Sequence, residues 1–236
     1  MNILIVGMGR AGSSFAAALS EAHRVTLVHH DEPVDTAAAD LVLLCIPDDA
    51  LAAFAATLRV ARDTVVAHVA GSRGLDVLAP HPRVGSMHPL ATMPDTLVGA
   101  QRLRGGVYCV EGDALLLDVV ASLGGRVIGV PSDRRTLYHA TAASAANHLV
   151  ALMSHVAALA TASGLALADF LPLAQQAFDD VVALGPSRAL TGPATRGDAA
   201  TIAAHVRVLP EEERDTYVAL ARRAVRLAEE GVTWNA

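Results

Sequence analysis

The sequence contains no lysine, since all 18 of its basic residues are arginines. A reaction that needs a lysine base, acid or Schiff base is therefore excluded. The chain of 236 residues has a formal net charge of −6, and its arginines are scattered along it. This distribution offers no electrostatic footprint to a nucleic-acid backbone, so we expect no nucleic-acid partner.

Aromatic residues and cysteines are also scarce, at 3% of the chain and two residues. Cys45 and Cys109 are too few for a disulfide scaffold. Because 53% of the residues are hydrophobic and the net charge is modest, intrinsic disorder is excluded as well. The core must be built from Leu, Val and Ile, in one or two domains.

Long uninterrupted apolar runs are missing too. Residues 1–6 form a short apolar run without a basic flank, so we expect no secretion. The most apolar long segment, 136–167, is interrupted by three histidines and Asn147, and such groups are costly in lipid. We therefore expect a soluble cytoplasmic protein that does not associate with membranes.

The first half of the chain alternates β-branched runs with helical runs, which is typical of an α/β fold with a doubly wound parallel sheet. No strand pattern follows Pro131, so we expect an all-helical C-terminal domain with a boundary near Ser132. The predicted strands are 2–6, 25–29, 40–46, 64–70, 84–87, 106–110 and 126–130, and the predicted helices are 12–22, 50–58, 113–123, 134–163, 168–183, 199–208 and 210–230.

A glycine-rich loop follows the first predicted strand and opens the first helix, which is the context that a G-x-G-x-x-G motif requires. Its glycines permit a tight turn, a close approach of backbone amides to a pyrophosphate, and close packing of helix on strand. The alternative is a glycine-rich turn without a ligand. Residues 1–131 are thus predicted to be a Rossmann-like NAD(P)-binding domain, with a phosphate loop of Gly7, Met8, Gly9, Arg10, Ala11 and Gly12.

The choice of cofactor depends on the end of the second strand, where an acidic residue binds the ribose of NAD. If that strand ends at Val28, His29 and His30 occupy this place and Asp31 comes late. A 2′-phosphate then has room, so we expect NADP(H) rather than NAD(H). Ile46 and Pro47, which follow the third strand, complete the predicted cofactor site.

Several strings of residues together resemble a bacterial family of Rossmann-like proteins with a DUF2520 carboxy-terminal domain. The resemblance covers nearly the whole chain and implies that 132–236 is a helical substrate and dimerisation domain of the six-phosphogluconate-dehydrogenase type. It also implies kinship with NADP oxidoreductases, including pyrroline-5-carboxylate and ketopantoate reductases. The strings are the loop at 7–12, Cys45 to Asp49, Gly85 to Leu90, Tyr138-His139 with Asn147 and His148, and Leu190 to Asp198 with Thr201 and His205.

The absent lysine matters for this resemblance. Related β-hydroxyacid dehydrogenases are expected to use a lysine four residues before an asparagine on the long helix. If Asn147 is that asparagine, Ala143 stands in place of the lysine. The mechanism of those enzymes therefore cannot be transferred unchanged.

Other polar groups must then serve the reaction, and we predict His88 and His139 as proton donors and Asn147 as the group that positions the carbonyl. His88 follows a predicted strand at the carboxyl edge of the sheet, although it could equally bond the backbone in a turn fixed by Pro89. The histidine-proline pair is also similar to that of prephenate dehydrogenases.

Two further groups are candidates for substrate binding. A step of 100° per residue places Ser144 and His148 in one polar sector of the long helix, with Thr141 and His155, either as cleft lining or as satisfied core groups. Arg196 precedes a helix start and suits a carboxylate, or else forms a surface ion pair. Asp198 is predicted to cap that helix. We assign no metal site.

These observations predict a homodimeric NAD(P)H-dependent oxidoreductase that reduces a small carboxylate-bearing 2-oxo acid. The resemblance suggests 2-dehydropantoate, and hence a place in pantothenate synthesis. Imine reduction of the pyrroline-5-carboxylate reductase type, a prephenate-dehydrogenase-like reaction, and a non-catalytic NADP-binding sensor or partner protein remain as alternatives.

Overall fold

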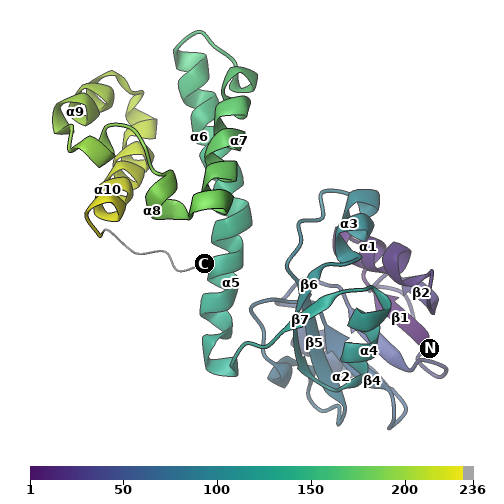
Figure 1. Cartoon of the computed structure of the whole chain (residues 1–236). Helices are drawn as coiled ribbons and strands as arrows, with labels where there is room; N and C mark the ends of the chain where they lie inside the picture. Colours follow the sequence, from purple (N-terminus) through teal and green to yellow (C-terminus); the bar gives the residue numbers. More distant parts are fainter. Residues whose placement is uncertain (231–236) are drawn as a thin grey trace. The chain divides into compact units, whose positions relative to one another are not determined.

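A computed structural model describes residues 1–230. By internal contacts the chain forms two compact units, the first of which is Met1–Ala146, while the second begins at Asn147 (Figure 1). The sequence places the boundary near Ser132. The contacts place it later, because the helix that follows Pro131 is anchored to the first unit.

The first unit contains a seven-stranded sheet in the order β2-β1-β3-β4-β5-β6-β7. Neighbouring strands are parallel except β5 and β6, which are antiparallel. The expected α/β fold with a doubly wound parallel sheet is confirmed, and the pair β5 and β6 is the one departure from parallel pairing. The strands are β1 (Asn2–Val6), β2 (Arg24–Val28), β3 (Leu41–Leu44), β4 (Val65–His68), β5 (Val84–Pro89), β6 (Val107–Gly112) and β7 (Arg126–Ile128).

The reversal at β6 has a structural cause that the sequence pattern does not encode. The connection from β5 to β6 contains α3 (Thr96–Leu103), a helix that the sequence did not predict. Ala100 and Leu103 of α3 are buried in the same core cluster as Phe15 and Leu19 of α1 (Arg10–Leu19). The chain thus packs α3 beside α1 and re-enters the sheet at the edge where β5 ended.

Both faces of the sheet are covered, as the continuous apolar runs in its central strands require. Ile3 and Ile5 of β1 belong to the cluster that includes α1, α3 and α4 (Leu115–Ser122). Leu4 and Val6 point to the opposite face and pack in the cluster of α2 (Leu51–Thr57). This alternation fixes the register of β1 and hence the position of the loop that follows it.

The predicted helix 134–163 contains a π-helical turn. It consists of α5 (Arg135–Ala143), the turn Ser144–His148 and α6 (Leu149–Ala162). A π turn changes the angular phase of the residues that follow, so the predicted sector from Thr141 to His155 is not one continuous stripe. His155 is buried and pairs with Glu213, which makes it a satisfied core group.

By length and composition, the helical segment Ser132–Ala162 could cross a membrane, and 11% of its most apolar stretch is buried within the described residues. Core helices of soluble proteins can have the same length and composition, so this observation alone assigns no membrane location. The remaining helices of the second unit are α7 (Leu167–Leu184), α8 (Pro186–Ala189), α9 (Ala199–Val208) and α10 (Arg214–Glu230).

The side chain of Arg135 anchors α5 to the sheet. It is only 5% exposed, and its guanidinium bonds a Glu111 carboxylate oxygen at 2.5 Å, the Ala70 carbonyl oxygen at 3.2 Å, and the hydroxyl of Ser86. These three acceptors come from β6, from the residues after β4, and from β5. A buried charge with such partners is costly to lose, because the partner charge remains.

We expect the substitution Arg135→Met to lower the free energy of unfolding by about 2 kcal/mol, since the Glu111 carboxylate, which is 26% exposed, would lose its cation. Chemical denaturation of the purified protein measures this change. Arg134→Met removes an exposed charge one residue earlier and should change stability by less than about 0.5 kcal/mol. Equal effects of the two substitutions would contradict the anchoring role.

Candidate active site

The loop between β1 and α1 has the backbone that the glycine motif predicts. Gly7 adopts a φ of +112°, and a Cβ at this position would lie 2.3 Å from the Cys45 carbonyl oxygen. A Cβ on Gly12 would lie 1.8 Å from the Gly7 carbonyl oxygen, so helix and strand meet too closely for a side chain. Gly9, at the N-cap of α1, has no atom within 4 Å of its Cβ position. Two glycines are therefore required by packing, whereas Gly9 leaves open space.

A cleft of about 370 Å³ lies directly beside this loop. It is formed by residues that follow β1, β2 and β3, three strands of which β1 is the middle one. In a sheet with this strand order the chain changes winding direction between β1 and β3, and ligands bind at such switch points. The cleft is lined by Gly7, Met8, Gly9, His29, His30, Cys45, Ile46 and Pro47.

The cleft thus brings together seven of the ten residues predicted to bind cofactor. Of the other three, Arg10 and Ala11 lie at the start of α1 and Gly12 in its first turn, where Gly12 packs against the Gly7 carbonyl. Cys45 also lines the cleft, although the sequence analysis did not predict it as a cofactor-binding residue. Its position directly after a buried strand and one residue before the predicted Ile46 and Pro47 could have indicated it.

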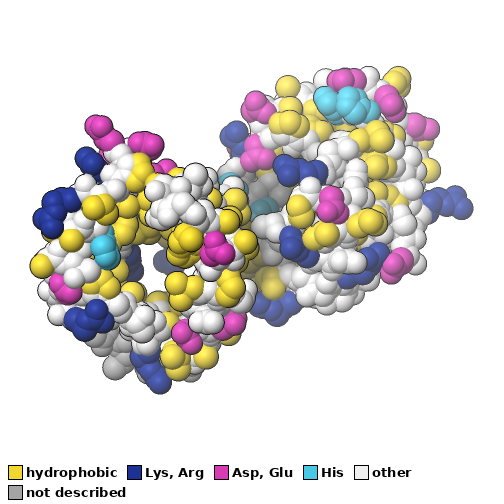
Figure 2. All heavy atoms as spheres, turned by 90° about the horizontal axis from the view of Figure 1, so that it is seen from above, with side chains coloured by type: hydrophobic (Ala, Val, Ile, Leu, Met, Phe, Trp, Pro, Cys, Tyr) yellow, Lys and Arg dark blue, Asp and Glu magenta, His cyan; other side chains and the backbone are white. Residues whose placement is uncertain are grey.

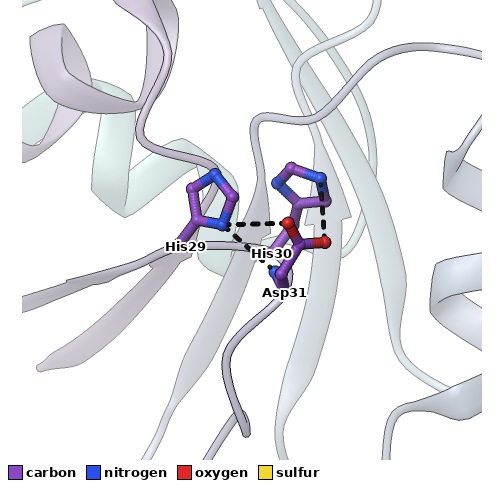
Figure 3. Close-up of side chains that lie close together, drawn as sticks. All are labelled: His29, His30 and Asp31. Carbon is purple, nitrogen blue, oxygen red and sulfur yellow. Dashed lines mark hydrogen bonds and ion pairs between the residues drawn. The ribbon is translucent and has the colours of Figure 1, made fainter.

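His29 and His30, which line the cleft, follow β2 directly, and the Asp31 side chain lies beside them (Figure 3). The Asp31 carboxylate lies 3.4 Å from His29 Nδ1 and 3.3 Å from His30 Nε2, and all three side chains are at least 42% exposed. Their ligand atoms lie within 4.8 Å of one another, so the cluster could hold a metal ion by distance. Two imidazoles at the end of β2 equally suit a phosphate, to which their N–H groups can donate.

A second set of polar side chains gathers farther along the carboxyl edge of the sheet. His88 lies inside β5 rather than after it, because the strand continues to Pro89. Its Nδ1 lies 2.7 Å from the Tyr138 hydroxyl, and its ring lies 5.9 Å from that of His139 between centroids. The two predicted proton donors, His88 and His139, are therefore neighbours in the first unit.

The loop after β4 connects this cluster with the loop after β3. A Cβ on Gly71 would lie 2.7 Å from His88 Nε2 and 2.6 Å from His139 Cδ2, so both rings contact a residue without a side chain. Next in the chain, the Ser72 hydroxyl donates to the Asp48 carboxylate at 2.7 Å. Because Asp48 directly follows the cleft residue Pro47, the histidine cluster and the cleft belong to adjacent loops of one edge.

The charge state of His88 follows from its surroundings. Burial, and then the neighbouring His139 and Arg135, lower the pKa of His88 to about 4, while Asp48 opposes this change. The imidazole is therefore neutral at pH 7. A neutral ring donates a hydrogen bond from one nitrogen and accepts at the other, but it holds no additional proton to release.

The remaining predicted residues lie on the π-helical turn or in the second unit. Ser144 donates to the Ala140 carbonyl at 2.9 Å, and Asn147 and His148 are exposed. Arg196 ends a short 3-10 helix, Ala194–Arg196, in the loop before α9. Asp198 caps α9 by accepting the Thr201 backbone N–H at 3.0 Å, which confirms its predicted role as a cap.

Sequence reasoning missed three features of the histidine cluster: the hydrogen bond between Tyr138 and His88, the contact of Gly71 with both rings, and the anchoring of α5 by Arg135. Tyr138 carried a signal, because it stands beside His139 in an apolar segment. Gly71 and Arg135 carried none, since their contacts depend on strand order.

A larger cavity of about 480 Å³ lies in the second unit between α9 and α10. Apart from Arg222 and Arg226, apolar residues line it, and none of the predicted site residues does. Volume alone therefore does not identify the functional site. The smaller cleft combines backbone amides, imidazoles and a strand switch point, which are the features that bind a dinucleotide.

Two family models match the sequence. The model described as domain of unknown function (DUF2520) matches residues 107–224, half of the chain, and the Rossmann-like domain model matches residues 27–94. The chain belongs to the DUF2520 family. The resemblance inferred from the residue strings is thereby confirmed. No curated protein shows significant similarity to the sequence.

Solved structures share the fold over nearly the whole chain. A proposed NADP oxidoreductase from Bacteroides fragilis is 23% identical with a TM-score of 0.81, covering 95% of this chain and 98% of that chain. A reductive aminase from Aspergillus terreus, in complex with NADPH and ethyl levulinate, is 17% identical with a TM-score of 0.68, covering 98% and 94%. A 1-pyrroline-5-carboxylate reductase from Streptococcus pyogenes is 17% identical with a TM-score of 0.62, covering 98% of each chain.

Proposed function

We propose that this DUF2520 protein is an NADP(H)-dependent oxidoreductase that reduces a carbonyl or imine carbon of a small carboxylate-bearing substrate. The observation that carries the proposal is the cleft at the switch point between β1 and β3, with Gly9 open beside it. The shared fold with an oxidoreductase and with a reductive aminase in complex with NADPH supports it.

The residues of the cleft fit a dinucleotide at both ends. Gly9 is the N-cap of α1 and has open space at its Cβ position, and the free N–H groups of a helix N-terminus favour a pyrophosphate there. His29 and His30 stand where an adenosine 2′-phosphate would lie, and their ring N–H groups can bond it. This placement supports NADP(H) over NAD(H).

The bound cofactor supplies the hydride, and the protein must position the acceptor carbon and complete the proton balance. When the hydride bonds to that carbon, the electron pair of the C=O or C=N bond moves to the oxygen or nitrogen, which then takes a proton. His88 holds this atom by a hydrogen bond from Nε2, and His139, whose ring lies beside it, delivers the proton. Contacts of Asn147, Ser144, His148 and Arg196 with the substrate stay predictions.

The substitution Gly9→Ala tests the cofactor site. Gly9 has a φ of −71°, which alanine adopts, and no atom lies within 4 Å of the added Cβ, so folding should be unaffected. The methyl group fills the space required by the pyrophosphate, so the Kd for NADPH, measured by calorimetry, should rise by about tenfold or more.

Gly129→Ala is the matched control, because Gly129 also has open space at its Cβ position and lies outside the cleft. It should leave the Kd for NADPH unchanged. If Gly9→Ala binds NADPH as tightly as the wild type, the dinucleotide does not lie along this loop.

Turnover distinguishes the proposed enzyme from a non-catalytic sensor. We expect the wild-type protein to oxidise NADPH in the presence of a small 2-oxo acid, with 2-dehydropantoate as the first to be tried, and to prefer NADPH over NADH by about tenfold or more. Steady-state kinetics with both cofactors measures this. Tight NADPH binding without oxidation by any 2-oxo acid or cyclic imine would assign the protein to the sensor class.

Imine reduction is the second candidate reaction. The fold shared with a reductive aminase and a pyrroline-5-carboxylate reductase favours it, and a neutral His88 can bond an imine nitrogen as well as a carbonyl oxygen. Comparison of kcat/KM for a 2-oxo acid and a cyclic imine carboxylate in the same turnover experiment decides between the two.

A homodimer through the helical unit is part of this proposal. Helix α7 has no buried residue, and apolar side chains lie at the surface of this unit (Figure 2). Phe178 and Val182, one turn apart on α7, are 55% and 73% exposed. Exposed apolar helix faces of this length are typical of subunit interfaces, and a second copy supplies the same face.

We expect light scattering to give the mass of a dimer for the wild type and of a monomer for Val182→Glu, because a charge would be buried at the interface. Leu97→Glu is the control, since Leu97 is 75% exposed on α3 in the first unit, and it should remain dimeric. A monomeric wild type would contradict the proposed assembly.

A further inference from the structure

Two tyrosines of the described chain bond a histidine through its Nδ1 atom. In the first unit the Tyr138 hydroxyl lies 2.7 Å from His88 Nδ1, with the rings edge to face at 88°. In the second unit the Tyr217 hydroxyl lies 2.6 Å from His205 Nδ1, with the rings at 82°. The pairs share one geometry, but only the first belongs to the candidate active site.

The direction of the hydrogen bond between the Tyr138 hydroxyl and His88 Nδ1 depends on which ring nitrogen carries the hydrogen. Burial raises the pKa of the Tyr138 phenol well above its ordinary value, so the hydroxyl is neutral at pH 7 and is able to donate or to accept. The other polar partner of this hydroxyl is the thiol of Cys109, and sulfur is a weak acceptor. An unprotonated ring nitrogen is a stronger acceptor than sulfur, which favours donation from the Tyr138 hydroxyl to His88 Nδ1.

The other nitrogen of His88 lies against Gly71 and makes no hydrogen bond within the described residues. Nε2 does not belong to the fully buried polar atoms without a partner, so part of its surface remains accessible. Gly71 keeps this surface clear, because a Cβ there would lie 2.7 Å from Nε2. The proposed function requires the substrate atom to reach this nitrogen from the carboxyl edge of the sheet.

The groups around His88 keep its ring uncharged. The charged and titratable neighbours are His139 and Arg135 on α5, Asp48 after β3, and His68 on β4. Burial and these neighbours together lower the pKa of His88 to about 4. At pH 7 the ring therefore carries a single hydrogen, on Nδ1 or on Nε2, and the bond from Tyr138 decides which.

We propose that Tyr138 is a positioning residue: by donating to Nδ1 it fixes His88 in the tautomer whose Nε2–H group bonds the oxygen or nitrogen of the reducible double bond. The role of His88 toward a substrate rests on the proposed function. The tautomer of His88 does not depend on that function, so an experiment can contradict either claim without the other.

Long-range proton–nitrogen NMR correlation of the wild-type protein tests the tautomer directly. At pH 7 we expect the His88 signals to show an unprotonated Nδ1 and a protonated Nε2. The spectrum of His88→Asn, which lacks these signals, assigns them. A protonated Nδ1 in the wild type would overturn the proposal whether or not the protein is a reductase.

Kinetics tests the positioning role. In Tyr138→Phe we expect kcat for NADPH oxidation to fall by about tenfold while the Kd for NADPH stays within about twofold, because the hydroxyl acts on His88 and not on the cofactor. Tyr217→Phe removes the equivalent hydroxyl from the second pair and should leave kcat unchanged. An unchanged kcat in Tyr138→Phe would overturn the positioning role. If that variant does not fold, the wild-type spectrum still decides the tautomer.

Discussion

The position of the histidine cluster depends on the hydrogen bonds of the buried Arg135 guanidinium. It bonds acceptors from β5, β6 and the residues after β4, and so fixes the first turn of α5 against the sheet. Tyr138 and His139 lie about one turn later on the same helix, which brings their side chains to His88. Without this anchor, α5 would have few buried contacts with the sheet, since Arg135 is its one buried residue.

The same arrangement explains how the protein could work without lysine. In a lysine-dependent reductase an ammonium group supplies both a hydrogen bond and a proton. Here burial and the positive charge of Arg135 keep His88 neutral, so that residue can supply the hydrogen bond but not the proton. Under the proposed function, the two tasks are divided between His88 and the partly exposed His139 beside it.

Much of the first unit could be predicted because local sequence determines it. All seven strands were expected, and the phosphate loop follows from three glycines whose packing the structure explains at Gly7 and Gly12. Seven of the predicted cofactor residues line one cleft, because each follows a strand that ends at the same edge. Helix α3 and the reversed β6 could not be predicted, since strand direction depends on packing between distant segments.

The long helix that follows Pro131 shows the limit of helical periodicity. The π-helical turn Ser144–His148 inserts a change of phase that no residue pattern announces, so the predicted polar sector on the long helix is interrupted. Asp198, by contrast, was correctly predicted as a cap because capping depends only on residues three positions apart. Contacts such as Tyr138 with His88, 50 residues apart, require the fold.

A structure of the NADPH complex tests the central claim most directly. The account predicts the adenosine 2′-phosphate at His29 and His30, the pyrophosphate beside Gly9, and the nicotinamide C4 within reach of a substrate atom bonded to His88 Nε2. A cofactor bound in any other place, or with its nicotinamide directed away from His88, would contradict it.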